Sequence, residues 1–224
     1  MTTNPQFDAI FDFDGVLADS APLIVEILER LLCRELGMTL TTGQLRTAVG
    51  PPFHQAVADL CSSTNTSPDA TCIETIVESF RSEYAARVAD ETPMFTGVQE
   101  MLATMHGNFR MTICSSKPRP LIDAILTSWG LRDIFAAVEA PSVGSTETKT
   151  AGLARLLSGL ATRTTNCALI GDTTYDAAAA KENRVPFVGV TWGIGRADEL
   201  TAAGAVALID HPRQLITTLS RISP

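Results

Sequence analysis

The chain has 224 residues, 45% of them hydrophobic and 6% aromatic, a composition typical of one large domain, or one domain with a smaller insert, around an ordinary core. Its formal net charge is −8 and no lysine- or arginine-rich run offsets it, so the average field would repel a nucleic acid. A small phosphorylated ligand is not excluded, because a few local cations or one metal ion can override that average.

The N-terminal part of the chain is predicted to form one strand followed by helices. A short apolar strand covers 7–13 and ends among acidic residues, after which Asp19 and Ser20 offer helix N-caps. Apolar residues then recur at helical spacing along 23–32, and Gly37 is suited to end that helix. Further helices are predicted over 43–49, 53–60 and 73–84, with a polar loop at 62–69.

After Pro93 short apolar segments alternate with helical ones. Strands are predicted at 111–114, 134–138, 167–170, 187–190 and 206–208, and helices near 97–106, 119–129, 148–159, 174–183, 196–203 and 212–221. This alternation indicates parallel βαβ units. We therefore predict an α/β fold, in which residues 1–15 and 94–224 form a doubly wound, mostly parallel, Rossmann-like sheet and residues 16–93 form a helical insert.

Polar side chains follow four of these segments, where a sheet of this kind places its active site. Asp12 and Asp14 follow the first strand, Ser115 and Ser116 follow the strand at 111–114, Lys149 stands at the start of the helix at 148–159, and Asp172 and Asp176 follow the strand at 167–170. The DxDG and GDxxxD patterns that hold the acids are each weak alone. Together, in this order and at strand ends, they are improbable as accidents.

These residue types suit the chemistry of phosphate esters. The phosphate dianion repels a nucleophile until cations neutralise it, and Mg²⁺ prefers oxygen ligands, of which one or two carboxylates suffice. Asp12 and Asp172, on separate strand ends, can supply them. A carboxylate can also attack phosphorus to form an aspartyl-phosphate, while a second acid protonates the leaving alcohol. Ser115 is suited to hydrogen-bond one phosphoryl oxygen and Lys149 to neutralise another.

The chain resembles the haloacid dehalogenase superfamily, specifically its phosphoglycolate-phosphatase-like branch with a helical cap. The segment 11–20 looks like the opening signature of the superfamily, and 50–53 looks like a cap motif of the branch. Ser115 and Lys149 match the phosphate-binding positions, Asp172 and Asp176 match the acidic metal motif, and 188–205 is similar to the C-terminal region of the branch. The likeness covers nearly the whole chain.

The resemblance implies a role for each of the acids. Asp12 would be the nucleophile and a Mg²⁺ ligand, and Asp14 the general acid and base, with its backbone carbonyl also on the metal. Asp172 would be a metal ligand, and Asp176 a ligand through water or an organiser of the site. The insert would be a mobile cap that closes over the substrate and excludes water.

Two departures from the relatives stand out. The segment 144–150 contains Lys149 but lacks the Lys-Pro-x-Pro form that is common among them, which points to a particular subgroup. Thr173 stands where many relatives have arginine or serine. Neither departure removes a catalytic group, although both blur what the sequence says about the substrate.

Several of these residues also have plain structural interpretations. Ser115 could cap the helix that follows it, Lys149 could be solvated, and Asp176 could be a first-turn acid that the helix dipole favours. Ser116 and Lys117 either line the pocket beside Ser115 or have no part in it. Both interpretations stay open at this point.

The insert offers its own candidates for contact with the substrate. Arg46, Phe53 and His54 flank the 50–52 loop. Their structural interpretations are a surface charge for Arg46, a cap-core residue for Phe53 and an exposed or hydrogen-bonded imidazole for His54. Trp192 follows a late strand, and we expect it to be buried against the core.

The predicted function is a Mg²⁺-dependent phosphatase of small phosphate monoesters, such as phosphoglycolate, a nucleotide or a sugar phosphate, which acts through an aspartyl-phosphate. One alternative is a phosphomutase of the same fold, similar to β-phosphoglucomutase. Another is a catalytically idle protein that binds a phosphorylated metabolite.

The expected setting is the cytoplasm, with a small phosphorylated metabolite as partner and neither nucleic acid nor membrane. The five cysteines lack CxxC spacing and are interpreted as reduced thiols. The sequence shows no signal-peptide pattern, and no apolar run approaches the ~20 residues that span a bilayer. No association segment is evident, so we expect a monomer.

Overall fold

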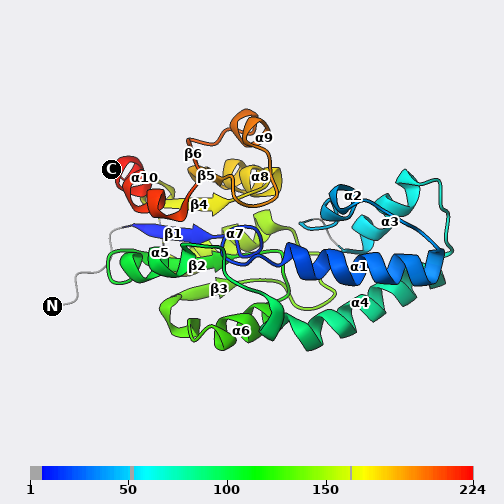
Figure 1. The fold of residues 1–224 in the computed structure, drawn as a ribbon. Helices are drawn as coiled ribbons and strands as arrows, with labels where there is room; N and C mark the ends of the chain where they lie inside the picture. Colours follow the sequence, from blue (N-terminus) through cyan, green and yellow to red (C-terminus); the bar gives the residue numbers. More distant parts are fainter. Residues whose placement is uncertain (1–6, 51–52, 162, 224) are drawn as a thin grey trace. The chain divides into compact units, whose positions relative to one another are not determined.

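The computed structural model describes residues 7–50, 53–161 and 163–223, and its elements are drawn in Figure 1. The chain divides into two compact units, of which one joins Met1–Asp19 to Pro93–Pro224 and the other is Ser20–Thr92. The first contains every strand that the structure describes, and the second is helical.

The larger unit is built on a six-stranded parallel sheet, which confirms the predicted α/β class. Its strands are β1 (Asp8–Phe11), β2 (Arg110–Cys114), β3 (Ala137–Glu139), β4 (Cys167–Gly171), β5 (Phe187–Val190) and β6 (Ala207–Ile209), in the order β3-β2-β1-β4-β5-β6. This is a doubly wound order, because the chain moves outward from β1 in one direction and then, after a crossover, in the other. The carboxyl ends of all six strands therefore face the same edge.

One strand is displaced from its predicted position. The apolar residues 134–138 were expected to be a strand, but the structure has a 3-10 turn at Arg132–Ile134 and begins β3 only at Ala137. Phe135, between the two, is buried in the core. Phe135 is thus buried although it lies before the strand, so apolar character alone could not show where the strand begins.

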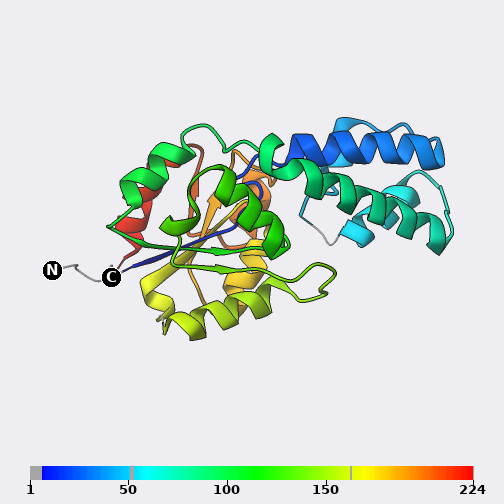
Figure 2. The same ribbon diagram turned by 90° about the horizontal axis from the view of Figure 1, so that it is seen from below.

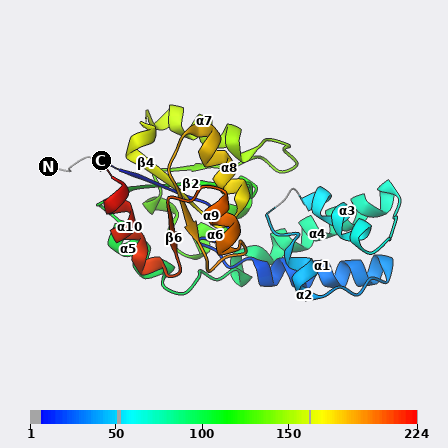
Figure 3. The ribbon, with the colours of Figure 1, turned by 90° about the horizontal axis from the view of Figure 1, so that it is seen from above.

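Helices cover both faces of this sheet. They are α5 (Val98–Met105), α6 (Arg119–Ser128), α7 (Lys149–Leu160), α8 (Thr174–Asn183), α9 (Ala197–Ala202) and α10 (Leu215–Ile222). Helices α7 and α8 contact each other on one face, and α5 and α10 lie on the opposite face (Figures 2 and 3). Leu153 and Leu156 of α7 and Ala177 of α8 pack in a buried cluster with Leu169 of β4, so this face of the core holds both helices in place behind the strand ends.

The helical unit contains α1 (Ala21–Leu36), α2 (Thr42–Arg46), α3 (Phe53–Ser63) and α4 (Ala70–Glu91). Gly37 ends α1 in the left-handed conformation, as predicted. Ser20 is the N-cap residue of α1, as predicted, but its backbone is already helical there and its side chain makes no capping hydrogen bond. Pro51 and Pro52 of the proposed cap motif lie outside the described residues.

Helices α1 and α4 are joined by charged side chains as well as by their apolar faces. Arg87 of α4 donates to Glu26 of α1 (2.8 Å) and to Glu91 one turn further along α4 (2.6 Å). Phe53 stacks on Phe80 with ring centroids 3.8 Å apart, which supports its interpretation as a core residue of this unit. Bidentate arginine networks of this kind hold two helices in register.

The five cysteines are free thiols, and Cys61, Cys114 and Cys167 are buried. Burial raises the pKa of the Cys114 and Cys167 thiols to about 12, which keeps both thiols protonated and unreactive at neutral pH. Among the residues described, no helix has the length and apolar character needed to cross a membrane.

Candidate active site

The first acidic loop grows directly out of the sheet. Strand β1 pairs with β4, and the ladder continues one residue past its end because the Asp12 N–H donates to the Ile170 carbonyl (2.8 Å). The chain then turns at Gly15, where φ is +80°. A Cβ on Gly15 would stand 2.1 Å from Asp172 Oδ2. Only glycine therefore allows the two acidic loops to approach each other this closely.

Three carboxylates meet at the carboxyl edge of β1 and β4. Asp12, Asp172 and Asp176 each offer an oxygen, and these three atoms lie within 4.8 Å of one another. Asp172 and Asp176 are wholly buried, and Asp12 is 8% exposed. Parallel neighbouring strands end side by side, so acids that follow them converge on one pocket. The structure thus brings together the acids that the sequence placed on separate strand ends.

Lys149 lies among these carboxylates. Its Nζ is 2.7 Å from Asp12 Oδ1 and also forms an ion pair with Asp176 Oδ1. The side chain of Lys149 is 7% exposed, so the solvated interpretation is wrong. Because α7 begins at this residue, the first turn of the helix delivers the ammonium to the strand edge.

Asp176 also caps its own helix. The backbone N–H and the hydroxyl of Thr173 donate to Asp176 Oδ2, at 3.0 and 2.7 Å. The other carboxylate oxygen faces Lys149. Asp176 is therefore both a first-turn acid and a member of the carboxylate cluster. Thr173 fixes which of its oxygens faces the cluster.

Asp172 is held from behind by backbone. The Ile194 N–H donates to Asp172 Oδ2 (2.8 Å), and a Cβ on Gly195 would stand 1.8 Å from the Asp172 carbonyl oxygen. A Cβ on Gly193 would stand 2.3 Å from Asp172 Oδ2. Sequence reasoning missed this role of the two glycines; their GxG spacing after β5 was the available signal.

One oxygen of Asp172 is left over. Asp172 Oδ1 is buried and has no hydrogen-bond partner among residues 7–50, 53–161 and 163–223. A buried, unpartnered carboxylate oxygen is costly, and a divalent cation would satisfy it. The donor set is made of carboxylate oxygens, which are the ligands that Mg²⁺ prefers. The residues present therefore fit a Mg²⁺ ion.

The electrostatics of the cluster agree with that fit. Burial raises the pKa of Asp12 to about 6, although the Lys149 ammonium opposes the rise. Burial, together with Asp176 and Asp12, raises the pKa of Asp172 well above its ordinary range. Burial alone would lower the pKa of Lys149, but Asp12 and Asp176 outweigh it and raise that pKa. Three acids around one ammonium hold excess negative charge, which a second cation would relieve.

Asp14 has a cation of its own. Lys117 Nζ lies 3.1 and 3.2 Å from the two Asp14 carboxylate oxygens, and the Lys117 side chain is only 3% exposed. Lys117 thus belongs to the site, a question that the sequence left open. The carboxylate of Asp14 is outside the three-acid cluster, and its side chain is 21% exposed, so it can reach both solvent and a bound ligand.

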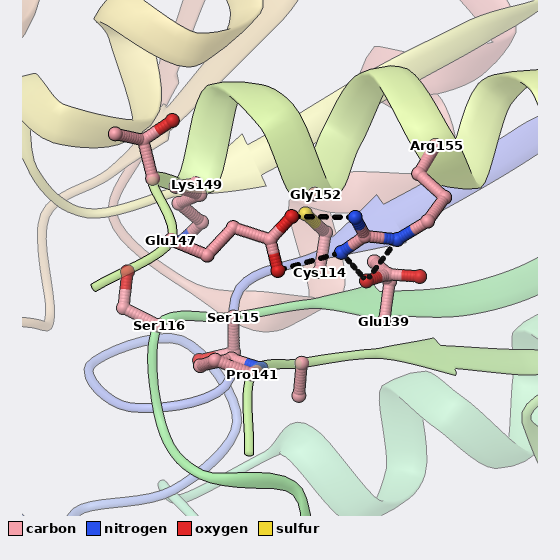
Figure 4. Close-up of a pocket in the computed structure, with 11 residues that line it drawn as sticks. Cys114, Ser115, Ser116, Glu139, Pro141, Glu147, Lys149, Gly152 and Arg155 are labelled. Atoms are coloured by element: carbon pink, nitrogen blue, oxygen red, sulfur yellow. Dashed lines mark hydrogen bonds and ion pairs between the residues drawn. The ribbon is translucent and has the colours of Figure 1, made fainter. Parts of the chain in front are cut away.

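Ser115 follows β2 and is buried. Its N–H donates to the Glu139 carbonyl (3.0 Å), and its Oγ accepts from the Lys117 N–H (3.3 Å). The N-cap of α6 is Pro118, so the interpretation of Ser115 as a helix cap is wrong. Ser115, Ser116 and Lys149 line one pocket, which Figure 4 shows in close-up.

The remaining candidates have different surroundings. Arg46 is exposed on α2 in the helical unit, and its contact with a substrate stays a prediction. His54 is exposed and lies 3.5 Å from Glu74. Trp192 was expected to be buried but is half-buried, and its Nε1–H donates to the Val16 carbonyl (3.1 Å), which links the loop after β5 to the loop after Asp14.

A doubly wound parallel sheet with acids, a serine and a lysine gathered at its carboxyl edge is the arrangement of α/β enzymes, which bind their ligands at that edge. The chain belongs to the haloacid dehalogenase-like hydrolase family, whose model matches residues 9–190.

Relatives in this family carry more than one activity in their names. The chain is 29% identical to the tyrosine-protein kinase PtkA of Mycobacterium tuberculosis, over 95% of this chain and 73% of that one. It is 28% identical to a phosphoglycolate phosphatase of Caulobacter vibrioides, over 94% of this chain and 91% of that one. Among solved structures, a predicted phosphatase from Clostridium acetobutylicum superposes with a TM-score of 0.84 at 25% identity, covering 97% of this chain and all of that one.

Proposed function

We propose that the protein is a Mg²⁺-dependent phosphatase that hydrolyses small phosphate monoesters through an aspartyl-phosphate on Asp12. The observation that carries this proposal is the buried cluster of Asp12, Asp172 and Asp176 beside the Lys149 ammonium. Carboxylates and a cation at one strand edge are what an in-line attack on a phosphate dianion requires.

Asp12, Asp172 and Asp176, with the Asp14 backbone carbonyl, would hold Mg²⁺, which supplies charge neutralisation for the phosphoryl group when bound. Ser115 and Ser116 hydrogen-bond phosphoryl oxygens, and Lys149 neutralises another. These side chains line or border the same pocket. The contacts fix the phosphorus atom in line with the carboxylate of Asp12.

The reaction consists of two displacements at phosphorus. In the first, an Asp12 carboxylate oxygen forms a bond to phosphorus while the ester P–O bond breaks and Asp14 gives its proton to the leaving oxygen. In the second, Asp14 takes a proton from water, the water oxygen bonds to phosphorus, and the bond to Asp12 breaks to release phosphate. Asp12 and Asp14 are restored at the end of the cycle.

We propose that the helical unit serves as a cap and that its Arg46 contacts the part of the substrate beyond the phosphate. Phosphoglycolate is one candidate substrate, because relatives that carry its phosphatase name cover nearly the whole chain. Nucleotides and sugar phosphates share the same reacting group. The free cysteines agree with a reducing compartment, and we propose a cytoplasmic monomer.

A second candidate is the transfer of a phosphoryl group to a tyrosine hydroxyl. The observation that favours it is the 29% identity to the tyrosine-protein kinase PtkA over 95% of this chain. Incubation with ATP and a tyrosine-containing protein, read out by a phosphotyrosine antibody, tests it directly. Phosphotyrosine that depends on Asp12 would establish the transfer.

Phosphate release from a panel of small phosphate esters, with Mg²⁺ and with EDTA, tests the proposed phosphatase. Asp12→Asn should abolish release, by about 10³-fold or more, because an amide cannot attack phosphorus. Release without an added bisphosphate separates hydrolysis from a mutase reaction. Release that persists in Asp12→Asn would overturn the mechanism. Tight binding of the same esters without turnover would favour the idle binding protein.

A further inference from the structure

The loop that delivers Lys149 to the site lies between β3 and α7. Gly144 turns it with φ +79°. The Ser145 N–H donates to the Ser142 carbonyl (3.1 Å), and the Glu147 N–H donates to Ser145 Oγ (3.2 Å). These bonds fold the loop upon itself but do not fasten it to the sheet. Residues 144–150 contain no proline that would stiffen the segment.

Arg155 supplies a fastening from the next turns of α7. Its guanidinium donates through Nη1 and Nη2 to both oxygens of Glu147, at 2.9 Å for the Nη2–Oε2 contact. The same group donates from Nε to Glu139 Oε1 at 3.1 Å and again from Nη2. Figure 4 shows the guanidinium between the two carboxylates. Since Glu139 ends β3, one side chain ties the helix, the loop and the sheet together.

This arrangement borders the phosphate pocket without entering the reaction. Arg155, Glu139 and Glu147 line the same pocket as Ser115 and Lys149. The Arg155 side chain is 52% exposed, and both of its acids are more buried than it is, at 20% and 31%. Its donors are engaged by carboxylates, so it is poorly placed to receive phosphate. A bidentate network of this kind is stronger than an isolated surface pair.

We propose that Arg155 is a positioning residue, which clamps Glu147 against Glu139 and thereby holds the 142–148 loop so that Lys149 stays beside Asp12. The effect of the clamp on turnover rests on the proposed phosphatase function. The clamp itself does not, because it concerns the order of the loop.

Steady-state kinetics of Arg155→Ala test the effect on turnover. We expect kcat to fall about tenfold and KM to change less than about threefold, because a loose Lys149 is less often in place when charge develops on the phosphoryl group. Arg132→Ala is the matched control, since it removes a half-buried arginine of the same unit that pairs with Asp123 (2.9 Å) and not with the loop. Arg155→Lys should recover part of kcat, because an ammonium restores the charge without the planar fork.

Hydrogen exchange tests the clamp without turnover. Amides of 142–151 should exchange about tenfold faster in Arg155→Ala than in Arg132→Ala. Glu147→Gln combined with Arg155→Ala should have no larger effect on kcat than Arg155→Ala alone, because both changes open one contact. Unchanged exchange at 142–151, or a kcat within about twofold of the Arg132→Ala control, would overturn the proposal. If the wild-type protein releases no phosphate, the proposed function fails while the exchange experiment still tests the clamp.

Discussion

The two sides of the site are built by different means. On the proposed metal side, Asp12 and Asp172 follow paired strands, and the backbones of Gly15 and Gly193 lie directly against the Asp172 carboxylate. On the proposed phosphate side, Lys117 and Lys149 reach the site through long side chains, and each is held by ion pairs. The acids of the first side are positioned by the backbone and by close packing. The lysines of the second side are positioned by ion pairs and by the conformations of their side chains.

This difference teaches where the site can tolerate change. A backbone contact at van der Waals distance has no slack, so one added methyl group displaces a ligand. The Asp14 side chain is 21% exposed, so water can solvate its carboxylate when Lys117 is removed, and the loss of that ion pair costs less. We therefore expect substitutions against the Asp172 carboxylate to be more damaging than a substitution of Lys117.

Among the substitutions, Gly15→Ala should lower activity the most. A small loss of activity would contradict the expected difference between the two sides of the site. The new Cβ would stand 2.1 Å from Asp172 Oδ2 at a residue with φ +80°, so the carboxylate must shift, and kcat/KM should fall about 100-fold or more. Gly107→Ala is the matched control, because Gly107 has φ +83° and open space around its Cβ position. The control should lose only ~1 kcal/mol of stability and keep its activity. Equal activity in the two variants would show that the approach of Gly15 to Asp172 does not matter.

Lys117→Met tests the phosphate side. Removing the ammonium leaves Asp14 without the cation that holds both of its oxygens, so the acid should be positioned less well and kcat should fall about tenfold, with a smaller change in KM. Lys181→Met removes an exposed lysine of α8 and should leave kcat unchanged. A loss as large as that of Gly15→Ala would mean that the two sides do not differ in tolerance.

Much of this arrangement was predictable from the sequence. Strands at 167–170 and 187–190 were expected and are β4 and β5 with nearly the same bounds. The convergence of Asp12, Asp172 and Asp176 followed from their positions after parallel strands, since strand ends meet at one edge whatever the side chains do. The catalytic and metal-binding roles of these acids stay predictions until they are tested.

The remaining contacts depend on how distant elements pack, which local pattern does not encode. Lys117 lies 103 positions from Asp14 along the chain, and no local sequence pattern around either residue predicts their ion pair. From the sequence, Gly193 and Gly195 are typical of an ordinary turn. The structure shows that both lie directly against Asp172. The sequence around Arg155 does not distinguish it from an ordinary surface arginine. Its contacts with Glu139 and Glu147 become visible only in the structure, where α7 packs against β3.

The last expected effect concerns stability rather than turnover, and it arises from metal and proton at the carboxylate cluster. Burial raises the pKa of Asp12 to about 6 from 3.8, so the folded protein without metal holds a proton that the unfolded chain releases between these values. The folded state therefore loses stability from this group as pH rises from about 4 to 6. Mg²⁺ competes with that proton, so its stabilising effect should grow over the same interval.

Thermal unfolding with and without Mg²⁺ measures this competition. At a Mg²⁺ concentration ten to a hundred times its Kd, the stabilisation should be about 1.4–2.7 kcal/mol, which corresponds to a rise in Tm of roughly 3–11 °C for a chain of this length. The rise should be clear at pH 7.5 and much smaller at pH 5. Asp172→Asn should remove it at both pH values, because the unpartnered Oδ1 then belongs to a neutral amide. A rise in Tm of equal size at pH 5 and pH 7.5 would show that the metal binds away from Asp12. The rigidity of the Asp12 and Asp172 side of the site would then come from packing alone.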